Sequence, residues 1–207
     1  SKETWKSFIR DLKARGLRNV LMITSDAHEG LCDAISKEFP QAAWQRCQFH
    51  FSKNIAEKAP KKYQAGIRSE LSEMFNCTTI EEARRKRDSI IADYQDVAES
   101  AMTCLDEGFE SSMTAMILPK YLRQYFRTSN HIERINRELK RRSKVIGVFP
   151  NEASILRLMG SVLMELNDTA QARKALFSPK TYNNLMSAEV KSKLIILANE
   201  QHLLRVS

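Results

Sequence analysis

The hydrophobic pattern of the first sixty residues alternates between helix and strand. In residues 2–15, apolar side chains recur at the i, i+3, i+4, i+7 spacing that predicts a helix with one buried face, and Gly16 is suited to end it. The continuous apolar run of residues 20–24 predicts a strand buried on both faces. Further along, the pattern predicts a helix, a short strand and a helix: residues 27–39, 42–47 and 50–58. This order indicates a parallel α/β sheet.

After residue 59 the strand signal disappears and the pattern becomes helical. Residues 60–120 predict an all-helical insertion, and a basic amphipathic helix over 130–144 follows. Two more helices are expected over 152–167 and 188–204. The predicted organisation is therefore an α/β part, a helical insertion, a return to the core with the basic helix, and a helical C-terminal tail: residues 1–59, 60–120, 121–170 and 171–207.

Composition narrows the classes of partner. The 33 Lys and Arg residues exceed the 25 Asp and Glu residues, which gives a net charge of +8 and favours an anionic partner such as nucleic acid, although a solvated basic surface gives the same count. The four cysteines form no CxxC pair, which favours a reduced, cytoplasmic protein. No apolar run is long enough for a membrane span, and no signal peptide is visible. Because the chain starts at Ser1 directly in a helical pattern, we expect a piece of something longer.

Asp26 is the first candidate for chemistry. It stands at the carboxyl end of the first predicted strand, where α/β sheets place their ligands, and its oxygens could hold a hard cation. The spacing from Asp26 to Glu29 also fits a capping box, with Asp26 as the N-cap of the next helix. Both roles are compatible because a carboxylate has two oxygens.

Glu133 is the second candidate. It lies on the basic helix beside an apolar stripe that we expect to be buried: Ile132, Ile135 and Leu139. An acid among bases at the edge of a packed face suits a metal ligand close to bound phosphate. Two structural roles compete with this one: Glu133 as the N3 partner of an Asn130 N-cap, or an i,i+4 ion pair with Arg137. Glu138 is the competing acid on this helix.

The segment from Arg127 to Lys144 carries seven Lys or Arg residues against two acids, a net charge of +5. Such a helix can lie along a DNA backbone, and it can equally be a solvated helix face. Elsewhere, Cys47 and His50 form a CxxH pair that could supply two zinc ligands. With no second ligand pair nearby, a buried Cys beside a hydrogen-bonding His is the interpretation we favour.

Several short motifs occur together in a fixed order. The motifs are SDAHEGL over 25–31, WQRCQFH over 44–50, TSN over 128–130 and GVFPNEAS over 147–154. Between the last two lie ER at 133–134, NR at 136–137 and KRR at 140–142. In this order and with these gaps, the chain from Ser1 to about Asp168 resembles the Mutator-type transposases of bacterial insertion sequences, which are DDE transposases. The tail beyond Asn167 matches less clearly.

The resemblance implies a partial ribonuclease H-like α/β fold with an all-helical insertion, helix-rich overall. It implies a triad of two aspartates and a glutamate, in which Asp26 matches the second aspartate and Glu133 the glutamate, together holding Mg²⁺ or Mn²⁺. Cys47 and His50 match a CxxH signature whose role we take as structural. The DNA-contacting residues would be Arg134, Arg137, Lys140, Arg141, Arg142 and Lys144.

One departure from the family pattern matters for activity. The first aspartate would lie upstream, since the acids before Asp26 are Glu3 and Asp11 on the opening helix. The expected function is therefore that of a transposase catalytic-core fragment for metal-dependent DNA cleavage and strand transfer, inactive alone. The alternatives are another ribonuclease H-like nuclease, such as a junction resolvase, and an inactive truncated transposase that binds DNA or oligomerises. The expected partners are DNA, both the element ends and the target, and further copies of the chain in a homodimer or larger assembly. We expect no membrane and no small-molecule substrate. The expected location is the bacterial cytoplasm, in association with the nucleoid.

Overall fold

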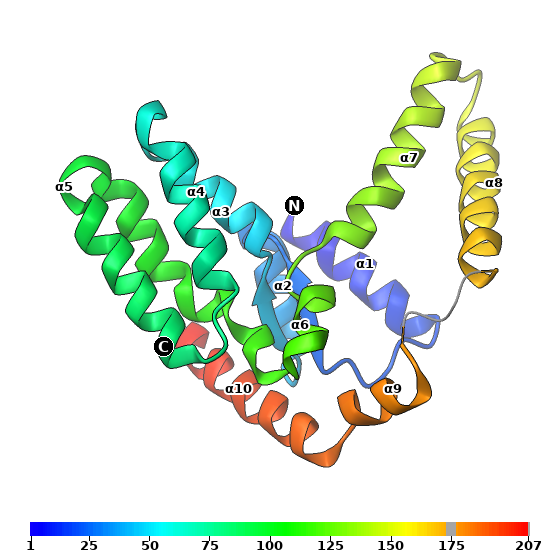
Figure 1. Cartoon of the computed structure of the whole chain (residues 1–207). Helices are drawn as coiled ribbons and strands as arrows, with labels where there is room; N and C mark the ends of the chain where they lie inside the picture. Colours follow the sequence, from blue (N-terminus) through cyan, green and yellow to red (C-terminus); the bar gives the residue numbers. More distant parts are fainter. Residues whose placement is uncertain (173–176, 207) are drawn as a thin grey trace. The chain divides into compact units, whose positions relative to one another are not determined.

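The computed structural model describes residues 1–172 and 177–206, with side chains up to Leu203. The described chain is rich in helix and contains a two-stranded parallel sheet (Figure 1). Its elements in chain order are α1 (Lys2–Ala14), β1 (Met22–Ser25), α2 (Glu29–Glu38), β2 (Ala43–Arg46), α3 (Gln48–Glu57), α4 (Lys61–Phe75), α5 (Ile80–Ser112), the 3₁₀ helix η1 (Thr114–Ile117), α6 (Lys120–Phe126), α7 (Asn130–Ile146), α8 (Glu152–Gln171), α9 (Pro179–Leu185) and α10 (Ala188–Val206).

The chain divides into two compact units. The first contains residues Ser1–Thr128 together with the C-terminal part from Leu185, and the second contains Ser129–Asn184. Each unit is described by itself below. None of the described helices combines the length and apolar character needed to cross a membrane.

The sheet of the first unit is small and parallel, as the alternation of helix and strand predicts. Its register runs from Met22 opposite Ala43 to Ser25 opposite Arg46. β2 is buried along most of its length, whereas three of the four β1 residues are only half-buried, so the prediction of a first strand buried on both faces is wrong. β2 is more buried than β1 because α5, α10 and η1 all contact it.

The largest core lies in the helical region after the sheet. Helices α3, α4 and α5 contribute fully buried apolar side chains to one cluster: Phe51, Ile55, Ile67, Leu71, Met74, Ile90, Leu105 and Phe109. α5 begins with a capping box, in which Thr79 and Glu82 exchange side-chain to backbone hydrogen bonds. In the described residues between Lys61 and Phe126 the structure has helices and no strand, which matches the helical pattern of this segment.

α5 reverses direction in its middle. Ala98 leaves the helical region of backbone space with φ −150° and ψ 44°. Arg84 and Glu110, 26 residues apart, form an ion pair at 3.1 Å, whereas the same separation along a straight helix is about 39 Å. The two halves of α5 therefore lie side by side as a helical hairpin, as Figure 1 shows in green.

The second unit is built on the α7–α8 hairpin, in which the two helices contact each other. Within its described residues, Val162 on α8 is the one buried side chain. The predicted buried stripe of α7 is wrong: Ile132 is 62% exposed, and Ile135 and Leu139 are half-buried. The amphipathic period is present, but a two-helix hairpin covers only the side chains that face the second helix.

Candidate active site

Asp26 lies just beyond the end of β1 and is exposed. Its Oδ1 accepts a hydrogen bond from the His28 backbone N–H at 3.4 Å. The N-cap of α2 is His28, whose Nδ1 accepts from the Leu31 N–H at 3.4 Å, so the predicted capping box of Asp26 and Glu29 is wrong. The reason is local: residue 28 is still extended, with φ −66° and ψ 119°, so the helix begins after the position that Asp26 could cap. The carboxylate of Asp26 thus stands at the sheet edge without a helix-capping role.

Backbone and side-chain hydrogen bonds hold the carboxyl edge of the sheet together. The Ser25 carbonyl accepts from the Cys47 N–H at 2.7 Å, and the Ser25 hydroxyl accepts from Trp44 Nε1 at 2.9 Å. Because the strands are parallel, the residues that follow β1 and β2 emerge at the same edge. Asp26 and Cys47 are therefore neighbours in the sheet's geometry.

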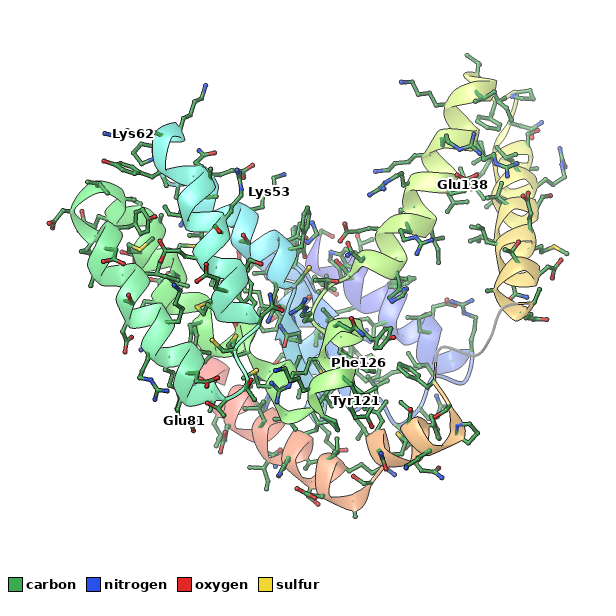
Figure 2. All side chains as sticks on the ribbon, in the orientation of Figure 1. Lys53, Lys62, Glu81, Tyr121, Phe126 and Glu138 are labelled. Atoms are coloured by element: carbon green, nitrogen blue, oxygen red, sulfur yellow. The ribbon has the colours of Figure 1, made fainter. Side chains whose placement is uncertain are left out.

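The segment that leads to α7 is attached to this sheet. The Thr24 hydroxyl donates to the Phe126 carbonyl at 2.6 Å, and the Gln48 N–H donates to the Arg127 carbonyl at 2.9 Å. Phe126 is labelled in Figure 2 at the end of α6. These bonds join parts of the chain that are 102 and 79 residues apart, and the hydrophobic pattern of the sequence does not predict them.

Cys47 and His50 lie at the start of α3. Cys47 is fully buried as the N-cap residue, and His50 is half-buried one turn later. The Cys47 Sγ and a ring nitrogen of His50 lie within 4.8 Å of each other, as the i, i+3 spacing on a helix requires. This geometry is compatible with either a structural pair or two metal ligands, so the structural role stays a prediction.

Glu133 lies in the first turn of α7, in the second unit. The N-cap of α7 is Ser129, so the interpretation of Asn130 as N-cap is wrong, since Asn130 is already the first helical residue. The Glu133 Oε1 accepts from the Ser129 hydroxyl at 2.6 Å. A carboxylate in the first turn is favoured by the partial positive charge of the helix N-terminus. Because Asp26 and Glu133 belong to different units, their approach to one another stays a prediction.

The basic residues of α7 fall into two groups. Arg141 and Arg142 both donate to Glu138, at 2.6 and 2.8 Å, and these two hydrogen bonds lower the pKa of Glu138 to about 2. Arg142 also donates to Glu165 of α8 at 2.9 Å, so it joins the two helices (Figure 2 labels Glu138).

The remaining four cations of α7 form no ion pair with the described residues, and all are exposed: Arg134, Arg137, Lys140 and Lys144. At 100° per residue, these four side chains project from one side of the helix. We call them the α7 basic face. That these four cations, with Arg141 and Arg142, contact DNA stays a prediction.

Comparison with known proteins places the chain in a family. A profile of the Mutator family of transposases matches residues 1–172. The chain belongs to this family. It is 39% identical over 186 residues to the transposase for insertion sequence element IS256 in transposon Tn4001 of Staphylococcus aureus, covering 89% of this chain and 46% of that protein. It is 37% identical over 164 residues to the transposase for IS1081 of Mycobacterium tuberculosis, covering 79% and 40% of the two chains.

These matches confirm the family resemblance carried by the sequence motifs. A third relative, the transposase for ISRM5 of Rhizobium meliloti, is 32% identical over 168 residues, which cover 81% of this chain and 42% of that protein. The Mutator-family chain thus spans about half the length of the curated relatives it matches. Asp26, Cys47, His50, Glu133 and the α7 basic face all lie inside the segment that the family profile matches.

Arg46 is a residue that the sequence interpretation passed over. It is the last residue of β2 and the third letter of the motif WQRCQFH. An arginine at a strand end is usually a solvated surface residue, so its type alone does not indicate a functional site. Its membership of the motif beside Cys47 was the available signal.

Proposed function

We propose that this chain forms part of the catalytic core of a DDE transposase that cuts and rejoins DNA with the help of Mg²⁺ or Mn²⁺. The observation that carries the proposal is the exposed carboxylate of Asp26 at the carboxyl edge of a parallel sheet, in a chain of the Mutator family. In this proposal the two-stranded sheet belongs to a larger ribonuclease H-like sheet. Asp26 and Glu133 supply carboxylate oxygens, the ligand type that Mg²⁺ prefers.

The protein groups would act mainly by positioning and by neutralising charge. A divalent ion held by these carboxylates would activate a water molecule, or in strand transfer the 3′-hydroxyl of the DNA, and would stabilise the leaving oxygen. The α7 basic face begins one residue after Glu133, at Arg134, so the phosphates it binds would lie close to the reacting group. The partners proposed are element-end and target DNA, with a homodimer or larger assembly expected by analogy.

A second candidate is a DNA-binding or oligomerisation module without activity of its own. One observation favours it for this chain alone. The acids that precede Asp26 are Glu3 and Asp11, both on α1, where they pair with Lys6 and Arg15. Neither stands at the end of a described strand, so neither is placed as a third carboxylate beside Asp26.

The test compares two carboxamide variants in a full-length transposase that contains this chain. Asp26→Asn and Glu133→Gln should each abolish Mg²⁺-dependent cleavage of element-end DNA while leaving DNA binding intact. Glu165→Gln is the matched control in the same unit as Glu133, because Arg142 keeps its hydrogen bond to Glu138 in this variant, and it should keep cleavage. Cleavage that persists in either of the first two variants would refute the assignment. If both variants keep cleavage while substitutions of acidic residues elsewhere in the full-length protein abolish it, the second candidate is favoured.

A further inference from the structure

Arg46 has an unusual environment for a surface-type side chain. Its guanidinium lies over the ring of Phe51, with 4.3 Å between the Arg46 Cζ and the ring centroid, and Phe51 is fully buried. Such stacking is favourable and fixes the plane of the guanidinium. Arg46 itself is half-buried, and its Nε is buried without a hydrogen-bond partner.

Gly108 on α5 provides the space that the guanidinium occupies. A Cβ at this position would lie 2.5 Å from the Arg46 Nη1 and 2.4 Å from the Phe51 Cε2, so any side chain would collide with both. Glycine inside a helix is unfavourable relative to alanine. The chain nevertheless has glycine at this point, and the arginine is thereby held between an aromatic ring and a helix backbone.

The charge of Arg46 is not compensated within the described residues. Among the other half-buried cations of this unit, Lys6 pairs with Glu3, Lys86 with Glu73 and Arg87 with Asp88. Arg123 and Arg127 have no carboxylate partner, but their guanidinium groups donate to backbone carbonyls. Arg46 forms no ion pair with a described carboxylate. A charge withdrawn from water is costly unless an opposite charge compensates it, which indicates that an anion completes this site.

We propose that Arg46 is a phosphate-binding residue at the carboxyl edge of the sheet. Arginine presents a planar set of donors that matches phosphate, and a guanidinium whose plane is already fixed loses little freedom on binding. Ser25 is opposite Arg46 in the sheet register, and Asp26 follows it directly. The bound group would be a backbone phosphate of the DNA strand that approaches Asp26, a step that rests on the proposed function.

The first experiment measures phosphate binding by the whole chain without DNA. Thermal unfolding is followed by circular dichroism in sodium phosphate and in sodium chloride of equal ionic strength. The wild-type melting temperature should be higher in phosphate, because a ligand that binds the folded state stabilises it. Arg46→Met should abolish this difference and Arg46→Lys should reduce it. The control Arg15→Met, which removes an exposed arginine at the C-cap of α1, should keep it.

The unfolding temperature in chloride separates a binding role from a structural one. If Arg46 exists to bind an anion, Arg46→Met should unfold at the same temperature as the wild type or higher, since an uncompensated charge is replaced by an apolar side chain of similar length. A lower melting temperature in chloride combined with an unchanged phosphate response would overturn the proposal. So would a wild type that shows no phosphate response.

The second experiment distinguishes a DNA phosphate from free phosphate. Affinity for a labelled duplex is measured by fluorescence anisotropy at several salt concentrations. Arg46→Met should make the slope of log affinity against log salt shallower by about 0.9, the loss expected for one phosphate contact. An unchanged slope, with the phosphate response lost, would overturn the DNA assignment and leave a site for free phosphate. Loss of cleavage in Asp26→Asn is measured separately, so failure of this inference does not imply failure of the proposed function.

Discussion

Glu138 pairs with two of the six Lys and Arg residues of α7, so under the proposed function it limits how many of them can bind phosphate. Arg141 has Glu138 as its carboxylate partner, whereas Arg142 has both Glu138 and Glu165. Glu138→Gln should therefore release Arg141 to a phosphate while Arg142 stays bound to Glu165. The α7 basic face would grow from four cations to five.

The expected size of the effect follows from counterion release. Four phosphate contacts contribute about −3.6 to the slope of log affinity against log salt, and five contribute about −4.5. Between 50 and 200 mM salt, the α7 contribution to affinity should then fall about 150-fold in the wild type and about 500-fold in the variant. Fluorescence anisotropy with a labelled duplex over this range resolves such a difference.

Glu165→Gln is the matched control for this prediction. It removes one acid from the same unit, but Arg142 keeps its hydrogen bond to Glu138, so no arginine is released. Its slope should equal that of the wild type. If Glu138→Gln also leaves the slope unchanged, or if Glu165→Gln steepens it equally, then α7 does not contact DNA through the residues named here.

Three further predictions concern stability. The pKa of Glu138 is lowered from 4.5 to about 2, so its stabilising contribution is complete above pH 4.5 and is lost as pH falls toward 2; circular dichroism should show an acid-induced loss of helix that is smaller in Glu138→Gln. Gln45→Leu leaves the Ala115 N–H without its acceptor in a buried site and should lower the free energy of unfolding by about 1–3 kcal/mol in urea titrations, and an effect near zero would contradict this. Leu71→Ala should cost about 2–5 kcal/mol, whereas Leu156→Ala, at a position 63% exposed, should change stability by less than about 0.5 kcal/mol, measured in the same way.

The sequence predicted the helices and strands of the first unit well because their signals are local. The helical pattern that starts after residue 59 matches α4, which begins directly after Pro60, and the next helix begins after Thr79 as its N-cap. The reversal of α5 at Ala98 could not be predicted, since neither glycine nor proline interrupts the helical pattern there. The turn is stabilised by packing between the two halves of α5. The spacing of apolar residues within one helix does not predict such a contact.

The site residues divide in the same way. The sequence singled out Asp26 and Glu133 by their residue type and position. The N-caps considered as alternative roles, Asp26 and Asn130, are both wrong, because the choice of N-cap depends on where the chain first turns. Arg46 was missed because its significance comes from Phe51 and Gly108, five and sixty-two positions away in the sequence. Only the folded structure brings these three residues together.

The two units differ in how many apolar side chains each of them buries. The unit that carries Asp26 has extensive buried apolar cores, whereas the described part of the unit that carries Glu133 has a single buried side chain, Val162. Because burial of apolar surface is the main stabilising contribution to folding, the Glu133 unit gains little from its own core. Within the first unit, the hydrogen bonds of Phe126 and Arg127 to the sheet fix the chain up to three residues before α7 begins.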